Sequence, residues 1–121
     1  AGPLAQVNRI TLLWCSFEAK PMILRVFGTA RTLHPRDPDF ATLNAYFPAS
    51  HGARQIYDVD IDMVQTSCGY AVPFMAYQGE RDILGNWADE KGSEGISTYW
   101  RDRNQSTIDG APTFILSDKE T

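Results

Sequence analysis

The chain lacks most of the features that mark secreted, membrane-spanning or nucleic-acid-binding proteins. Its 121 residues contain two cysteines, Cys15 and Cys68, too few for the disulfide framework of a small secreted domain, so we expect two reduced thiols. No apolar run approaches the roughly 20 residues needed to cross a bilayer, and no signal peptide opens the chain. A net charge of -4 argues against a phosphate-binding surface. These absences predict a soluble, cytoplasmic protein with no nucleic-acid or membrane partner.

Residue patterns that carry metal binding, phosphate binding or acyl transfer are scarce as well. His34 and His51 are far apart, and neither has a cysteine or carboxylate at metal-ligand spacing, so we predict no metal site. Gly28 stands alone rather than in a Gly-rich phosphate loop, and no nucleophile elbow is present. The sequence therefore excludes Rossmann, P-loop and hydrolase interpretations.

Two further features have a structural explanation that is better than a catalytic one. Asp58, Asp60 and Asp62 alternate along a predicted strand, which places them about 7 Å apart in an extended row typical of a solvated strand face. Cys68 has no identifiable base beside it to activate the thiol, so a packed or exposed thiol is favoured over a nucleophile. No catalytic residue can be named.

What the chain does have is the composition of one globular domain, residues 1–121, with 43% hydrophobic, 12% aromatic and 21% charged residues. Residues 9–17 and 22–33 are β-branched and aromatic runs with a short connection, which favours an antiparallel hairpin with Gly28 at a bulge or bend. The alternation of apolar and polar residues in residues 54–64 predicts a half-buried strand. Residues 71–77 are predicted to form a further strand. The strand in residues 54–64 should carry Tyr57, Val59, Ile61 and Met63 on one face.

Helices are expected in three places. Asp37 followed by Pro38 is typical of an N-cap and a first helical position, and an apolar spacing as far as Phe47 predicts a short helix that caps the sheet. Residues 81–91 and 94–104 are also predicted to be helical, separated by glycines, with one tryptophan on the apolar side of each. The whole is an α+β class, mainly β with short helices.

Five segments of the chain, in the order in which they follow one another, resemble the pyridoxamine 5'-phosphate oxidase-like, FMN-binding split-barrel family. The most specific are TSCGYAVPF, residues 66–74, and STIDGAP, residues 106–112; the others are residues 9–14, 23–31 and 99–101. The resemblance covers most of the chain and implies an antiparallel split β-barrel that forms a homodimer. It also implies FMN, held between two subunits, and a small-molecule substrate, with the redox chemistry belonging to the flavin.

The resemblance also suggests cofactor-binding residues. A Gln-Ser pair that contacts flavin in the family resembles Gln65 and Thr66 here, with Ser67 adjacent, and a Q-V-R-I-E-G stretch resembles residues 23–28, which keep Arg25 but have Ile23 in place of the glutamine. The resemblance to the wider family also implies that the segment with Trp100 and Arg101 approaches the partner's flavin. These positions are the predicted FMN contacts.

The family's N-terminal strands, which carry the basic residues that hold the FMN phosphate, have no counterpart before Arg9, so we expect an N-terminally incomplete barrel. Three functions remain open. They are an FMN-dependent oxidoreductase, a non-catalytic module that binds flavin or another planar ligand, and a degenerate split barrel that only dimerises.

Overall fold

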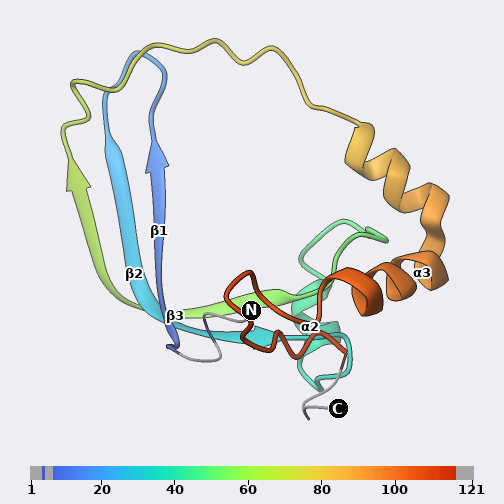
Figure 1. The fold of residues 1–121 in the computed structure, drawn as a ribbon. Helices are drawn as coiled ribbons and strands as arrows, with labels where there is room; N and C mark the ends of the chain where they lie inside the picture. Colours follow the sequence, from blue (N-terminus) through green and yellow to red (C-terminus); the bar gives the residue numbers. More distant parts are fainter. Residues whose placement is uncertain (1–3, 5–6, 117–121) are drawn as a thin grey trace.

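The computed structural model describes residue 4 and residues 7–116. Its elements are, in order, β1 (Arg9–Cys15), β2 (Ile23–Leu33), α2 (Phe40–Asn44), β3 (Ile56–Ser67) and α3 (Ile83–Arg103). The strands form one antiparallel sheet in the order β1-β2-β3, and an extended arm, residues 68–82, then carries the chain across to α3 (Figure 1). The predicted α+β class is confirmed. Over the described residues the sheet is open, so the barrel stays a prediction.

The β1–β2 hairpin is the one that the sequence predicts. Its register runs from Arg9 opposite Thr29 to Cys15 opposite Ile23. Gly69 lies against the turn of this hairpin with a φ of 63°, and a Cβ at that position would come within 2.8 Å of the backbone nitrogen of Met22. Only glycine combines this left-handed backbone with so close an approach.

Gly28 lies at a β-bulge, as the sequence predicts. The β2–β3 register shifts between Phe27, which pairs with Met63, and Gly28, which pairs with Ile61, so Asp62 is the extra residue on β3. The bulge corrects one sequence prediction. Met63 belongs to the same face as Asp60, rather than to the face of Ile61, because one inserted residue inverts the alternation of side chains beyond it.

Helix α2 is shorter than the sequence predicts and begins later. Asp37 does not cap it; instead its carboxylate accepts a hydrogen bond from the backbone N–H of His34 at 2.6 Å, which stabilises the turn before the helix. The N-cap position belongs to Asp39. The predicted apolar face is also incomplete, since Tyr46 and Phe47 are 81% and 59% exposed. Local hydrogen bonding by Asp37 competes with its use as a cap.

The predicted strand at residues 71–77 is wrong. This segment is extended but pairs with no strand of the described chain, and Met75 N–H donates one backbone hydrogen bond to the carbonyl of Phe17 at 3.2 Å. A turn closed by Val72 N–H on the carbonyl of Gly69 directs the chain past the end of the sheet. A strand pattern requires a neighbouring strand in register, which the arm does not have.

The two predicted C-terminal helices are confirmed as the two halves of α3. Gly92 separates them with φ 61° and ψ 177°, which no helical residue adopts. The buried apolar residues fall in two groups, one on β2 and one at α3 and the C-terminal segment: Val26, Ala30 and Leu33, and Ala88, Ile96 and Ile115. Among the described residues, no helix is both long and apolar enough to cross a membrane.

Candidate functional site

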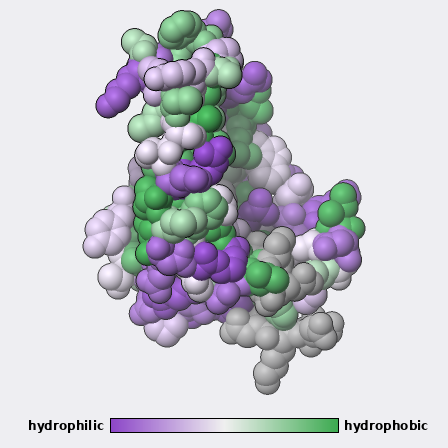
Figure 2. Space-filling model, turned by 90° about the vertical axis from the view of Figure 1, so that its left-hand side faces the viewer, coloured by the Kyte–Doolittle hydropathy of each residue, from purple (hydrophilic) through white to green (hydrophobic). Residues whose placement is uncertain are grey.

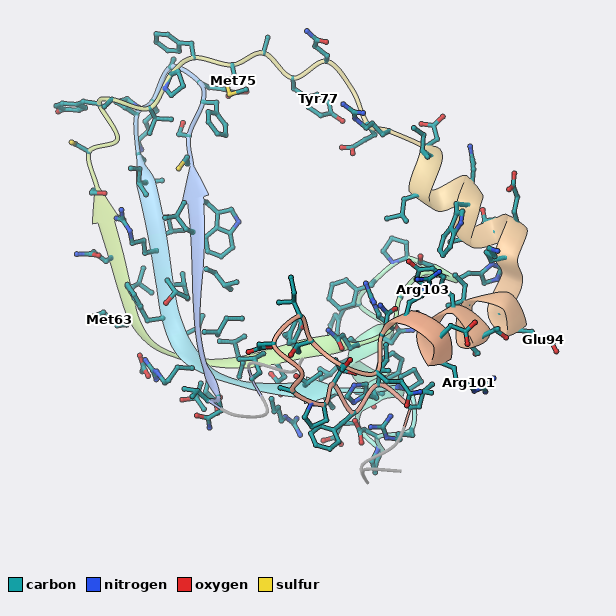
Figure 3. The ribbon with its side chains drawn as sticks, in the orientation of Figure 1. Met63, Met75, Tyr77, Glu94, Arg101 and Arg103 are labelled. Atoms are coloured by element: carbon teal, nitrogen blue, oxygen red, sulfur yellow. The ribbon has the colours of Figure 1, made fainter. Side chains whose placement is uncertain are left out.

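Three of the predicted FMN contacts lie together on the sheet. Arg25 pairs with Gln65, and the Nη1 of Arg25 donates a hydrogen bond to the Oγ of Ser67 at 3.1 Å. Because side chains alternate along a strand, Gln65 and Ser67 share the face of Met63. In Figure 3 Met63 lies on the outer side of the sheet, turned away from α3. We call Arg25, Gln65 and Ser67 the sheet cluster.

Thr66 is not part of the sheet cluster. It pairs with Leu24, one residue away from the Arg25–Gln65 pair, and therefore its side chain is on the inner face of the sheet. This inner face is apolar around it, with Trp14 and Val64 in the neighbouring pairs. The structure thus separates Thr66 from the two residues that flank it in the sequence.

Apolar side chains surround the sheet cluster. Leu13 pairs with Arg25, and Phe27 with Met63, on the same outer face. Leu13 and Met63 are 53% and 52% exposed. Figure 2, which views the molecule from the side of this face, shows hydrophobic and hydrophilic atoms interleaved along it. Such a surface offers an apolar support for a flat ring together with hydrogen-bond donors and acceptors at the ring's edge.

Ion pairs continue the outer face beyond the cluster. Arg9 hydrogen-bonds to the carboxylate of the bulged Asp62, and Arg31 bonds to Asp58 at 2.8 Å. The row of aspartates predicted to be a solvated strand face is therefore partly neutralised across the strands. The hydrogen bond from Arg9, with its positive charge, lowers the pKa of Asp62 below its ordinary value of 3.8.

This lowered pKa gives a pH prediction. We expect Asp62→Asn to destabilise the fold at neutral pH, since a carboxylate with a lowered folded-state pKa stabilises the fold above its unfolded value of 3.8. The difference from the wild type should vanish as the pH falls through the folded-state pKa, and urea unfolding at several pH values measures it. Asp60→Asn is the matched control, because Asp60 makes no ion pair within the described chain. A pH-independent difference would contradict the Arg9–Asp62 interaction.

The two predicted C-terminal contacts lie elsewhere, on α3. Trp100 lines a cavity of about 680 Å³ between the two halves of α3 and the loop before β3. Arg101 is exposed and does not line this cavity. In Figure 3 the helix stands across the molecule from the outer face of the sheet, so within one chain Trp100 and Arg101 do not join the sheet cluster.

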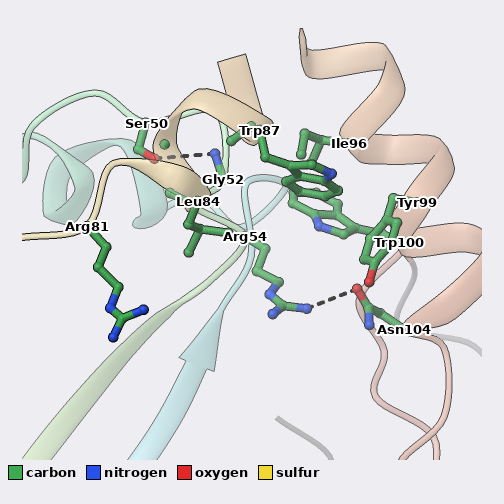
Figure 4. Close-up of a pocket in the computed structure, with 13 residues that line it drawn as sticks. Ser50, Gly52, Arg54, Arg81, Leu84, Trp87, Ile96, Tyr99, Trp100 and Asn104 are labelled. Carbon is green, nitrogen blue, oxygen red and sulfur yellow. Dashed lines mark hydrogen bonds between the residues drawn. The ribbon is translucent and has the colours of Figure 1, made fainter. Parts of the chain in front are cut away.

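The cavity, which we call the α3 pocket, combines aromatic side chains with arginines (Figure 4). The rings of Trp87 and Tyr99 meet edge to face, with centroids 5.2 Å apart and an interplanar angle of 79°. Its lining residues are Ser50, Gly52, Ala53, Arg54, Arg81, Leu84, Gly85, Trp87, Ala88, Ile96, Tyr99, Trp100 and Asn104. The sequence indicated that both tryptophans lie on apolar helix faces, but it did not indicate that Arg54 and Arg81 line the same pocket.

The remaining polar groups suggest no catalytic centre. Cys15 is half-buried and Cys68 exposed, and both are free thiols. Within residues 7–116, no three His, Cys, Asp or Glu side chains are grouped so as to hold a metal ion. What the described chain offers for function is the sheet cluster and the α3 pocket.

Comparison with known proteins gives one informative similarity. No protein-family model matches the chain, and no solved structure matches it. Among curated proteins, it is 30% identical, over an alignment 124 positions long, to the pyridoxamine 5'-phosphate oxidase family protein ustO of Aspergillus flavus. The alignment covers 90% of this chain and 50% of that protein, so the chain spans about half the length of the relative. Over this part, the chain belongs to the pyridoxamine 5'-phosphate oxidase-like family.

Proposed function

We propose that residues 1–121 form a single split-barrel-like domain that binds FMN and belongs to a flavin-dependent oxidoreductase acting on a small molecule. The observation that carries the proposal is the sheet cluster. Arg25, Gln65 and Ser67 come from two strands, yet they share one face, and Arg25 donates a hydrogen bond to Ser67. These are also the positions at which the family resemblance implies flavin contacts.

The side chains of the cluster fit the polar edge of a flavin ring. Gln65 is exposed, and its side chain makes no hydrogen bond within the described chain, so the side-chain amide is free to donate and to accept. Arg25 uses one N–H on Ser67 and keeps further donors for a carbonyl oxygen or ring nitrogen. The cluster has one cation, which suits the ring edge; the phosphate requires basic groups outside it.

Bound FMN would supply the hydride or electron transfer that the protein's own side chains do not offer. The chain's residues would bind and orient it. Gln65, with one donor group and one acceptor group, would favour a single orientation of the ring edge. The positive charge of Arg25 would favour electron density on that edge of the ring. Leu13 and Met63 would shield the ring from water on the protein side.

A homodimer is part of the proposal. The outer face carries exposed Leu13 and Met63, and the arm carries Phe74 and Tyr77 at 83% and 76% exposure. Large apolar side chains exposed in this number are typical of a protein–protein interface. Since Trp100 and Arg101 lie away from the sheet cluster within one chain, a contact of theirs with the same flavin would have to come from the second subunit.

The alternative function is a module that binds flavin or another planar ligand without turnover. It is favoured by one observation, that the sheet cluster contains no histidine, cysteine or carboxylate to act as an acid or base. Oxidation of a reduced nicotinamide by the FMN-loaded protein separates the two functions: turnover supports the oxidoreductase, and stoichiometric binding without turnover supports the module.

Gln65→Ala tests the proposed flavin site. We expect FMN affinity to fall by roughly two- to tenfold, the value of one lost hydrogen bond, with the dimer unchanged. Titration of FMN fluorescence measures the affinity, and sedimentation equilibrium measures the dimer. Thr66→Ala is the matched control, since this side chain is on the inner face and its loss should leave the affinity unchanged.

Three results would contradict the proposal. An equal loss in Thr66→Ala and Gln65→Ala would mean that the outer face does not hold the ring. An unchanged affinity in Gln65→Ala would remove this residue from the site. An unaltered protein that neither quenches FMN fluorescence nor is stabilised by added FMN would exclude flavin binding altogether.

A further inference from the structure

The walls of the α3 pocket are built from aromatic rings that fix one another. Trp87, on the first half of α3, packs edge to face against Tyr99 on the second half, and Trp100 lines the same cavity. Ala88 and Ile96 contribute buried side chains, each 3% exposed, to the same wall. Flat indole and phenol surfaces around a cavity favour a flat, apolar ligand body.

The charge of the α3 pocket is opposite to that of the chain. Its lining includes two arginines, Arg54 and Arg81, and no carboxylate, although the chain as a whole has a net charge of -4. The nearby carboxylate of Asp89 is 3.4 Å from the Nδ1 of His51 and does not line the cavity. A cavity with low-polarity walls and uncompensated cations attracts an anion.

The two arginines differ in how they are held. Arg54 Nη1 donates to the Oδ1 of Asn104 at 3.0 Å, which anchors its guanidinium at the end of α3, as Figure 4 shows. Arg81 makes no ion pair or hydrogen bond within the described chain, and it lies where the arm enters α3. One guanidinium is thus pre-positioned, and the other is available to a ligand. Both have the planar fork of donors that suits carboxylate and phosphate groups.

The size of the pocket is that of a small-molecule site. Its volume of about 680 Å³ falls well inside the roughly 300–1,000 Å³ of such sites. From the aromatic walls, the unpaired positive charge and this volume together, we infer that the α3 pocket binds a planar aromatic anion, a carboxylate or phosphate on a fused or single ring. The inference does not depend on the proposed flavin site, which is on the other side of the molecule.

Calorimetric titration with 2-naphthoate, 2-naphthyl phosphate and the neutral 2-naphthylmethanol tests the inference on the whole chain. Both anions should bind, and the neutral compound should bind at least tenfold more weakly, as expected for the loss of a charge-assisted hydrogen bond. Arg81→Gln should lower the affinity for both anions by a similar factor and leave the affinity for the neutral compound unchanged. Thermal melting checks that the variant is folded.

Arg103→Gln is the matched control, because it removes the same charge from an exposed arginine of α3 that does not line the pocket. Its affinity for 2-naphthoate should equal that of the unaltered chain. Equal binding of the neutral compound, or equal losses in Arg81→Gln and Arg103→Gln, would overturn the inference.

Adding FMN separates this inference from the proposed function. If FMN and 2-naphthoate bind without competition, and only Gln65→Ala lowers the affinity for FMN, both the proposed flavin site and the inference about the α3 pocket stand. If FMN displaces 2-naphthoate and Arg81→Gln weakens FMN, the α3 pocket is the flavin site, and the proposed site on the sheet is wrong while the inference holds. If FMN binds and neither naphthyl anion does, the inference alone fails.

Discussion

Gly28→Ala should destabilise the fold by about 1–3 kcal/mol, the usual cost of forcing atoms into a filled space. A Cβ at this position would lie 2.4 Å from the carbonyl oxygen of Asp60 and 2.8 Å from the Cγ1 of Val59. The first of these contacts is with backbone, which cannot rotate away as a side chain can. We therefore expect β3 to move at the bulge, and the urea midpoint of unfolding to fall.

Gly85→Ala is the control for this substitution. Apart from the helix's own backbone and the adjacent residues, no atom lies within 4 Å of a Cβ built at Gly85, which is in α3, and alanine favours helix by up to about 1 kcal/mol over glycine. The control should therefore be neutral or stabilising. An unchanged midpoint in Gly28→Ala would show that β3 does not approach β2 as described.

The bulge also determines which face Gln65 takes. With Asp62 as the extra residue, Met63, Gln65 and Ser67 share the outer face with Arg25. Without an extra residue, continued alternation from Asp58 and Asp60 would place Gln65 on the inner face. If Gly28→Ala removes the bulge, FMN affinity should fall together with stability. One glycine on β2 would then support both the sheet and the proposed flavin site.

The position of the bulge shows where sequence reasoning stops. Gly28 could be predicted as a bend because a glycine inside a strand pattern is uncommon. The inserted residue, Asp62, could not, because a bulge depends on how two strands pair and leaves no mark in the alternation of one of them. Because the extra residue was not predicted, Met63 was assigned to the wrong face of the strand.

The α3 pocket could likewise be predicted only in part from the sequence. The helical spacing around Trp87 and Trp100 predicted two apolar helix faces with a glycine between them, and the structure agrees. The predictions placed Arg54 at the start of the strand in residues 54–64 and Arg81 at the start of the first helix. The structure instead has them in the loop before β3 and in the arm, from where both line the pocket. Tertiary structure alone brings such separate segments together, just as it left the arm without a strand partner.

Gly92→Ala should abolish the α3 pocket. At φ 61° and ψ 177° Gly92 occupies a region that is nearly exclusive to glycine, where another residue costs about 1–3 kcal/mol. A Cβ there meets no atom within 4 Å, so the cost lies in the backbone and not in a clash. Since alanine is the best helix former, we expect the two halves of α3 to join into one straight helix.

A straight α3 would separate the aromatic walls of the pocket. Trp87 and Tyr99 are twelve positions apart, which corresponds to a rise of about 18 Å in a continuous helix, whereas the kink brings their rings to 5.2 Å. Near-UV circular dichroism should therefore lose the signal of this ring pair, and calorimetry should find no binding of 2-naphthoate.

Gly95→Ala is the control for the kink. It lies three residues further along α3, where the nearest atoms to an added Cβ all belong to the side chain of Lys91, beginning with its Cβ at 3.3 Å. This variant should keep the aromatic signal and the 2-naphthoate affinity. If Gly92→Ala also keeps both, the kink is held by packing of the two helix halves against the loop before β3, and the backbone of Gly92 follows that packing instead of producing it.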